Sequence, residues 1–296
     1  MMDTAIDTLE RWLSKRLTSE ANQWFETSVD TLLSKFSDRQ LYIILGKIPR
    51  VIGRNDLALA DAEIQQAGEL RRGWFPARWT LSGAARVLLL ARLGQADRTR
   101  LDTMYPSLCR TADYNELIDL YNGLSLISPS ETLTKLAADG LRTNTRAVFE
   151  SIAHHNPYPA ENFDEQRWNH MILKALFVDS TLGPIIGLDT RKNANLTRML
   201  HDYAKERRAA DRTVSVELWR CVGPFITNDT TGELLNDLAG LLASGNKDEQ
   251  RAAALALSES PDQRVAEIML SVPELRSALN NGKLSWQFNV TKPVHN

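Results

Sequence analysis

The stretch "HHNPYPAENFDEQRWNHMILKALF", residues 154–177, carries the strongest folding signals in the chain. Asn156 and Tyr158 each precede a proline, which pushes both toward extended backbone, so a helix before them must end and the chain must turn. Asn162 and Glu165 have the spacing of a capping box, which predicts that a new helix starts there. The stretch is therefore predicted to be a rigid corner between two core helices.

The helix expected over residues 163–178 has apolar side chains in nearly every direction around its axis. A helix that is apolar all round is usually buried, so we expect this one to be central. Its polar members, Asn169 and Lys174, then need partners, because burying a lone ammonium costs on the order of several kcal/mol. An ion pair or a stem that reaches solvent is the simpler explanation for Lys174, and an anionic ligand is the alternative.

Helical periodicity dominates the rest of the chain. Apolar residues within 196–204 fill the i, i+3, i+4, i+7, i+8 positions of one helix face. The best strand candidate, "LYIILGKI" at 41–48, is equally readable as a buried helix. Helix caps are predicted at Ser128, and at Asp189 or Asn193, because their side-chain oxygens can accept from first-turn amides.

Turn signals recur often enough to leave about one helix per 15–20 residues, a spacing typical of paired-helix stacks. The stretch 248–270 reads as one such pair, but no repeat of fixed length aligns along the chain. The predicted fold class is all-α, either an irregular α-solenoid of HEAT-like helical pairs or a multi-helix bundle. We expect one helical domain over 1–280, subdivided at 1–70, 71–225 and 226–280, and an extended tail over 281–296.

The bulk composition excludes several functional classes. The 296 residues include 35 Lys and Arg against 37 Asp and Glu, so phosphate attraction gives no reason to expect nucleic-acid binding. Cys109 and Cys221 are far apart and in no metal-like spacing, which fits a reducing compartment. The first residues do not resemble a signal peptide, and the longest apolar-rich run is too short for a bilayer, so we predict a cytoplasmic protein.

No pattern in the chain indicates a specific enzyme chemistry. His154 and His155 are adjacent, and neighbouring helical positions point about 100° apart, so they are unsuited to sharing one metal ion. No nucleophile elbow, phosphate loop or dinucleotide fingerprint is found, so we expect no cofactor and no metal, and the absence of a recognisable catalytic motif favours a protein without enzyme activity over an enzyme. Arg191 and Lys192 precede a helix start, where amide hydrogens already favour an anion.

A ligand, where one binds, is therefore expected within residues 154–212. The candidate residues for contacting it are His154, Asn156, Tyr158, Asn169, Lys174, Asp189 and Arg191.

Several motifs occur together between residues 70 and 225. They are "FESIA", "NPYPAENFDEQRWN", "LKALF", "GLDTR", "LTRMLHDYAKER" and "ELWRCVGPF". In these motifs the chain resembles the EboA family, whose genes lie in the ebo clusters that accompany secondary-metabolite pathways of bacteria and algae. The family pattern more often has glutamine at position 170 and tryptophan at 208, where this chain has His170 and Arg208.

The resemblance implies a role in moving or processing metabolite precursors, beside membrane-bound prenyltransferase-like and hydrolase-like proteins. The first function we infer is a non-catalytic binding or adaptor protein that assists processing or export of such precursors. Its expected partners are other ebo-cluster proteins and a small metabolite, with peripheral membrane association through a partner. The alternative is an enzyme acting on an anionic or aromatic metabolite near residues 154–212, with His154 as acid or base.

Overall fold

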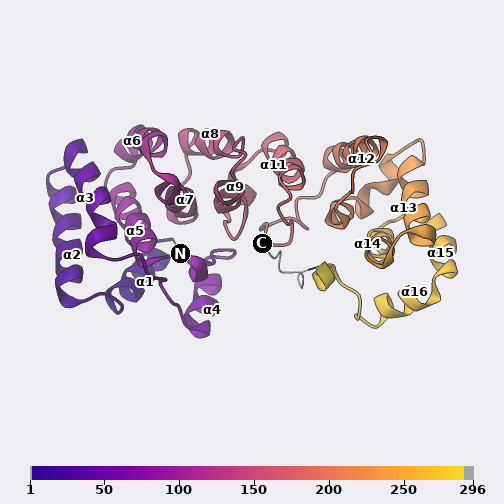
Figure 1. The fold of residues 1–296 in the computed structure, drawn as a ribbon, viewed down its shortest axis with the longest axis horizontal. Coiled ribbons are helices and arrows are strands. Elements are labelled where there is room, and N and C mark those ends of the chain that lie inside the picture. Colours follow the sequence, from indigo (N-terminus) through magenta and orange to yellow (C-terminus); the bar gives the residue numbers. More distant parts are fainter. Residues whose placement is uncertain (1, 290–296) are drawn as a thin grey trace. The chain divides into compact units, whose positions relative to one another are not determined.

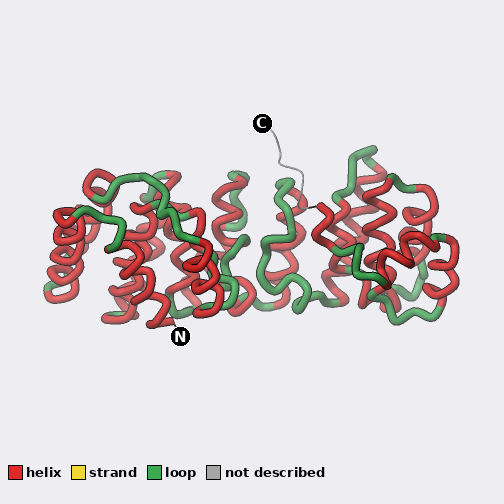
Figure 2. The backbone as a smooth tube through the Cα atoms, turned by 90° about the horizontal axis from the view of Figure 1, so that it is seen from below, coloured by secondary structure: helices red, strands yellow, loops and turns green. Residues whose placement is uncertain are grey.

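The computed structural model describes residues 2–289, and within them the secondary structure is helical, with no strand. Figure 2 shows the helices in red joined by green loops. An isolated antiparallel β-bridge joins Asp56 and Thr80. The segment 41–48 lies inside helix α3 (Asp38–Val51), so it is not a strand. The prediction of an all-α fold is confirmed.

The chain forms two compact units, Met1–Asp164 and Glu165–Asn296. The boundary between them falls inside the stretch 154–177 that predicted a corner. It coincides with none of the subdivisions expected from the sequence, and the division of the chain into domains stays a prediction.

In the first unit, the helices Ser19–Ser34 and Asp38–Val51 pack against each other as a hairpin, and the other helices precede or follow them in the chain. Its elements are α1 (Met2–Ser14), α2 (Ser19–Ser34), α3, α4 (Asp61–Leu70), η1 (Pro76–Arg78), α5 (Leu81–Ala96), α6 (Arg98–Thr111), α7 (Tyr114–Gly123), η2 (Leu124–Leu126), α8 (Glu131–Gly140), α9 (Arg146–Ala153) and α10 (Tyr158–Asn162).

Helices α6 and α8 form one layer of the first unit, and α5, α7 and α9 form the next (Figure 1). Helix α5 is its centre, because α1, α2, α3, α6 and α7 all pack on it. Thr80 caps α5 by accepting from the Gly83 amide, and 12 of its 16 residues are buried. Arg86 is only 4% exposed and forms ion pairs with Asp119 at 2.6 Å and Glu116 at 3.0 Å, which compensates the buried charge.

The second unit has its own central helix, α14. The elements are α11 (Glu165–Phe177), α12 (Ala194–Ala209), η3 (Val216–Cys221), η4 (Gly223–Asn228), α13 (Glu233–Ser244), α14 (Lys247–Ser258), α15 (Arg264–Ile268), η5 (Met269–Ser271), α16 (Pro273–Asn280) and η6 (Trp286–Asn289). Residues 252–257 of α14 are buried without interruption. Helices α13 and α16 and both 3-10 helices η3 and η4 pack around them.

Three local predictions need correction. Helix α11 was expected to be buried on all sides, but the side chain of Phe177 is 65% exposed. Asn169 is buried as expected, at 3% exposed. Ser130, not Ser128, caps α8, because the Ser130 hydroxyl accepts from the Leu133 amide. Asn162 donates back to the Tyr158 carbonyl and so belongs to α10 rather than capping α11.

Two further expectations concern α12 and the tail. Asn193 caps α12, accepting from the Leu196 amide at 2.8 Å, so Asp189 is not the cap. The expected extended tail over 281–296 contains the short helix η6, while residues 290–296 lie outside the described part of the chain.

Helix η4 approaches α14 so closely at Gly223 that a side chain at this position would clash. A Cβ on Gly223 would lie 2.3 Å from the Ala256 carbonyl oxygen, which is backbone and cannot move aside cheaply. We expect Gly223→Ala to destabilise the protein by about 1–3 kcal/mol through overpacking. Urea unfolding followed by circular dichroism measures this.

Gly68 is the matched control, because it lies in α4 and a Cβ there meets nothing within 4 Å. Gly68→Ala should stabilise the protein by up to about 1 kcal/mol through helix propensity. Equal effects of the two substitutions would contradict the packing of η4 on α14.

Candidate functional site

The seven residues expected to contact a ligand are divided between the two units. His154, Asn156 and Tyr158 belong to the first unit, and Asn169, Lys174, Asp189 and Arg191 belong to the second. Their convergence on one site stays a prediction. Each unit shows what its own members contact.

In the corner after α9, the side chain of Asn156 is fully occupied by backbone groups. Its Nδ2 donates to the carbonyl oxygens of Tyr121 at 3.1 Å and Ser151 at 3.2 Å. Its Oδ1 accepts from the Tyr158 amide at 3.0 Å. Asn156 is only 2% exposed, so these bonds replace the water that its amide would otherwise lose. The residue joins α7, α9 and the start of α10.

Tyr158 continues the same network into α8. Its hydroxyl lies 3.1 Å from the Thr134 hydroxyl, and both residues are buried. Burial raises the pKa of Tyr158, although the hydrogen bond with Thr134 opposes this shift. The phenol therefore stays protonated and acts as a structural link between α10 and α8.

The two adjacent histidines adopt different backbone conformations. His154 has extended backbone, and its amide donates to the Glu150 carbonyl, which ends α9. His155 has a φ of 51°, a left-handed conformation that a non-glycine residue seldom adopts. Its ring packs 4.7 Å from that of Phe75. Among the described residues, no group of three or more His, Cys, Asp or Glu side chains is placed to hold a metal ion.

In the second unit, the buried Asn169 pairs with the cap of α12. Asn169 Nδ2 donates to Asn193 Oδ1 at 3.1 Å, and Asn193 Nδ2 donates to Asn169 Oδ1 at 2.8 Å. This reciprocal amide pair ties α11 to the N-terminus of α12. Lys174 lies 5.0 Å from the centre of the Phe177 ring, in cation–π distance, and is half-buried.

Asp189 and Arg191 lie in the loop before α12 and have separate contacts. Arg220 donates to both carboxylate oxygens of Asp189, at 2.9 and 2.7 Å, which lowers the pKa of Asp189. Lys192 Nζ lies 2.5 Å from the carboxylate of Glu259, which directly follows α14, and this ion pair attaches the loop to the end of that helix. The guanidinium of Arg191 stacks over the Trp168 ring at 4.6 Å. These contacts fix the loop on the second unit.

A pocket of about 420 Å³ opens between one face of α12 and the segment that leads from η4 into α13. We call it the α12 pocket, and the residues that define its chemistry are Arg198, His201, Asp202, Lys205, Phe225, Asp229, Glu233 and Leu234. The sequence reading missed it, although Arg198, His201 and Lys205 have the i, i+3, i+7 spacing of one helix face. The sequence alone does not identify the partner of His201, because Asp237 lies 36 residues further along the chain.

His201 and Thr197 are buried polar residues that line the α12 pocket, at 6% and 4% exposed. Nε2 of His201 lies 3.0 Å from Asp237 Oδ2, which also accepts from Arg208 at 2.9 Å. Asp229 lies on the other wall. Burial would raise the pKa of Asp229, but hydrogen bonds from Thr231 and the Leu234 amide, with the nearby His201, lower it overall.

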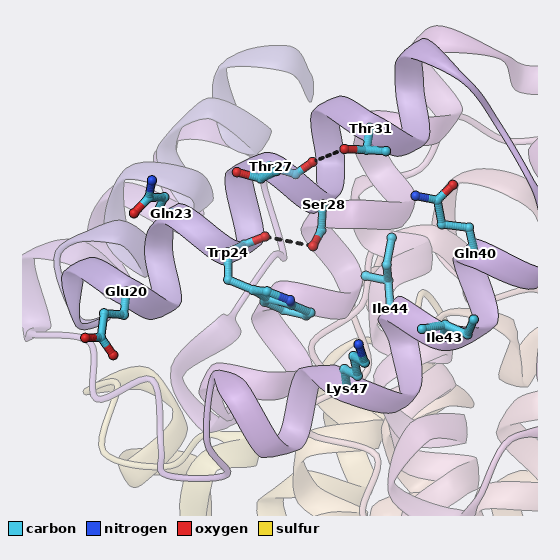
Figure 3. A pocket seen from close by; sticks show the side chains of 10 residues that line it. All are labelled: Glu20, Gln23, Trp24, Thr27, Ser28, Thr31, Gln40, Ile43, Ile44 and Lys47. Atoms are coloured by element: carbon cyan, nitrogen blue, oxygen red, sulfur yellow. Dashed lines mark hydrogen bonds between the residues drawn. The ribbon is translucent and has the colours of Figure 1, made fainter.

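A second concavity, of about 510 Å³, lies between α2 and α3 in the first unit. Figure 3 shows Trp24 and Ile44 between the two helices, with Ile43 and Lys47 along α3. The dashed bonds in Figure 3 are those of Ser28 and Thr31 to the carbonyls of Trp24 and Thr27, at 2.7 and 2.6 Å. These hydroxyls are satisfied within α2, so this wall is less polar than its composition suggests. We call this concavity the α2–α3 groove.

Comparison with known protein families places the chain. The family described as "Metabolite traffic protein EboA" matches residues 5–223. The chain belongs to the EboA family. The match confirms the resemblance seen in the motifs, and it includes α12 with the His201 side of the pocket. No curated protein and no solved structure matched this EboA-family chain. None of its described helices has the length and apolarity to cross a bilayer.

The strained His155 of this EboA-family chain generates a test of the corner. Burial, with the charges of His154 and Arg78, lowers the pKa of His155 to about 4. A folded pKa below the ordinary value of about 6.5 means that the unfolded chain takes up the proton first. Stability from this group is therefore present above pH 6.5 and is lost as the pH falls toward 4.

His155→Asn removes the titrating group and keeps a residue that tolerates left-handed backbone. We expect the free energy of unfolding of the variant to fall less steeply between pH 6.5 and 4 than that of the wild type. Urea unfolding at several pH values measures both slopes. Identical slopes would show that His155 is not buried as described.

Proposed function

We propose that this chain is a non-catalytic adaptor in metabolite traffic, which binds other proteins of its gene cluster and assists processing or export of metabolite precursors. The observation that carries the proposal is the α2–α3 groove with the apolar surface around it. Family membership supports the pathway, and the groove supports binding as the mode of action.

Exposed apolar surface is concentrated on this hairpin. Seven large apolar side chains are exposed among the described residues, and four of them, Leu33, Tyr42, Ile43 and Val51, belong to α2 and α3. A concentration of exposed apolar side chains rimmed by polar groups is a feature of protein interaction sites. Ile43, at 44% exposed, lies directly in the α2–α3 groove.

The groove also offers polar groups to a partner. Gln23, Gln40 and Lys47 line it and make no side-chain hydrogen bond to the described residues. An apolar floor with unpaired amides and an ammonium at its edges suits an amphipathic partner segment, whose apolar face would cover Trp24 and Ile43. By binding a cluster protein there, this chain would bring the proteins of the pathway together without catalysing a reaction itself.

The test is binding of the purified chain to each purified product of its gene cluster, measured by surface plasmon resonance. Ile43→Asp places a charge in the groove, so we expect it to weaken binding of the partner by about tenfold or more. Leu270→Asp is the matched control, because Leu270 is 63% exposed and lies in η5, outside the hairpin.

The control should bind as the wild type does, and both variants should unfold at the wild-type temperature because both positions are exposed. Failure of the wild type to bind any cluster protein would overturn the adaptor function. Equal binding by the Ile43 and Leu270 variants would remove the groove as its site.

A further inference from the structure

The α12 pocket has the size and the chemistry of a small-molecule site. Its volume of about 420 Å³ lies within the range of roughly 300–1,000 Å³ that ligand pockets occupy. Phe225 and Leu234 supply an apolar wall, and α12 supplies polar side chains opposite. Some charged groups of the pocket are already paired with each other, and the groups that remain unpaired determine which functional groups a ligand must carry.

Most charges of the pocket are compensated. Lys205 lies 3.2 Å from Glu233 and 3.5 Å from Asp202, so these three side chains form one network. Asp229 accepts from Thr231 and from the Leu234 amide. Arg198 differs, because its guanidinium makes no hydrogen bond or ion pair with the described residues. An anionic group on a ligand would supply the acceptor that this guanidinium lacks.

The second recognition element is the free nitrogen of His201. Nε2 of His201 is hydrogen-bonded to the Asp237 carboxylate, which also accepts a hydrogen bond from Arg208. A carboxylate can only accept, so in the neutral imidazole the proton is on Nε2. Nδ1 is then an acceptor. It has no hydrogen-bond partner among the described residues and is not fully enclosed, and His201 is one of the residues that line the pocket. A ligand must therefore present a hydrogen-bond donor to it.

We propose that the α12 pocket binds a small amino or hydroxy carboxylic acid, with the carboxylate on Arg198 and the amine or hydroxyl on Nδ1 of His201. The nearby Asp229 carboxylate favours the charged amine, and Phe225 and Leu234 contact an apolar side chain. No bond is made or broken in the ligand. This ligand site lies in the second unit and is independent of the partner surface on α2 and α3.

Four matched probes separate the two contacts, and isothermal titration calorimetry measures each on the full chain. They are L-phenylalanine, 3-phenyllactate, 3-phenylpropanoate, which has no donor, and phenethylamine, which has no carboxylate. Phenylalanine and phenyllactate should bind at least tenfold more tightly than the other two. Whichever of phenylalanine and phenyllactate binds more tightly then shows whether the natural ligand is an amino acid or a hydroxy acid.

Substitutions assign the contacts. Arg198→Gln should weaken phenyllactate binding at least tenfold, while Arg212→Gln, the same change at an exposed arginine outside the pocket, should leave it unchanged. His201→Gln can keep a donor on Asp237 but removes the Nδ1 acceptor, so the advantage of phenyllactate over phenylpropanoate should disappear. In the wild type, the ¹⁵Nδ1 resonance of His201 should move with phenyllactate and not with phenylpropanoate, which tests the contact without any variant.

Binding of none of the four probes at millimolar concentration would overturn the site. So would equal affinities for all four, or equal effects of the two arginine substitutions. Partner binding through Ile43 is measured separately, so the failure of one proposal leaves the other standing.

Discussion

The first unit depends on one buried amide. Asn156 lies at the point where α9 ends, and it bonds the carbonyl of Tyr121 at the end of α7, the carbonyl of Ser151 in α9, and the amide that opens α10. Burial of an amide without such partners would cost about 1–3 kcal/mol. Because all three bonds are made, the polar side chain fixes the turn instead of weakening it. Tyr158 then connects the same corner to α8.

The corner was predictable because its cause is local. A residue before proline is disfavoured in helical backbone, and Asn156 lies outside the helices as that rule predicts. Tyr158 also precedes a proline, but it begins α10, so its predicted extended backbone is wrong. The all-α class was predictable for a similar reason, since apolar periodicity reports which face each helix must bury. Three of the residues expected to contact a ligand, Asn156, Tyr158 and Asn169, make internal hydrogen bonds that hold helices together.

What the sequence could not reveal depends on distant partners. Helix α5 is the central helix of the first unit, yet Arg86 interrupts its apolar run, and its burial is possible only because Asp119 and Glu116 come from α7. Arg86 is thus a charged residue that is buried, and Phe177 of α11 is the reverse case, an apolar residue that was expected to be buried and is 65% exposed. The partner of His201 could not be predicted either, because Asp237 lies 36 residues away in the sequence.

In both units, some polar side chains are hydrogen-bonded within the unit and others are left available to a binding partner or ligand. Asn156, Asn169 and Asp189 are bonded to neighbours in their own units, and those bonds explain their presence. The groups that remain available are of another kind: apolar side chains and amides on α2 and α3, and the guanidinium of Arg198 with Nδ1 of His201. These are the groups on which the proposed partner surface and the proposed ligand site rest.

Hydrogen exchange of the Asn156→Ala variant, followed by mass spectrometry, tests this account most directly. If the amide joins α7, α9 and α10, exchange in all three helices should accelerate together, by about tenfold or more, while α12, α13 and α14 in the other unit keep wild-type protection. Faster exchange confined to residues 156–158, with α7 and α9 unchanged, would contradict the claim that Asn156 holds the first unit together.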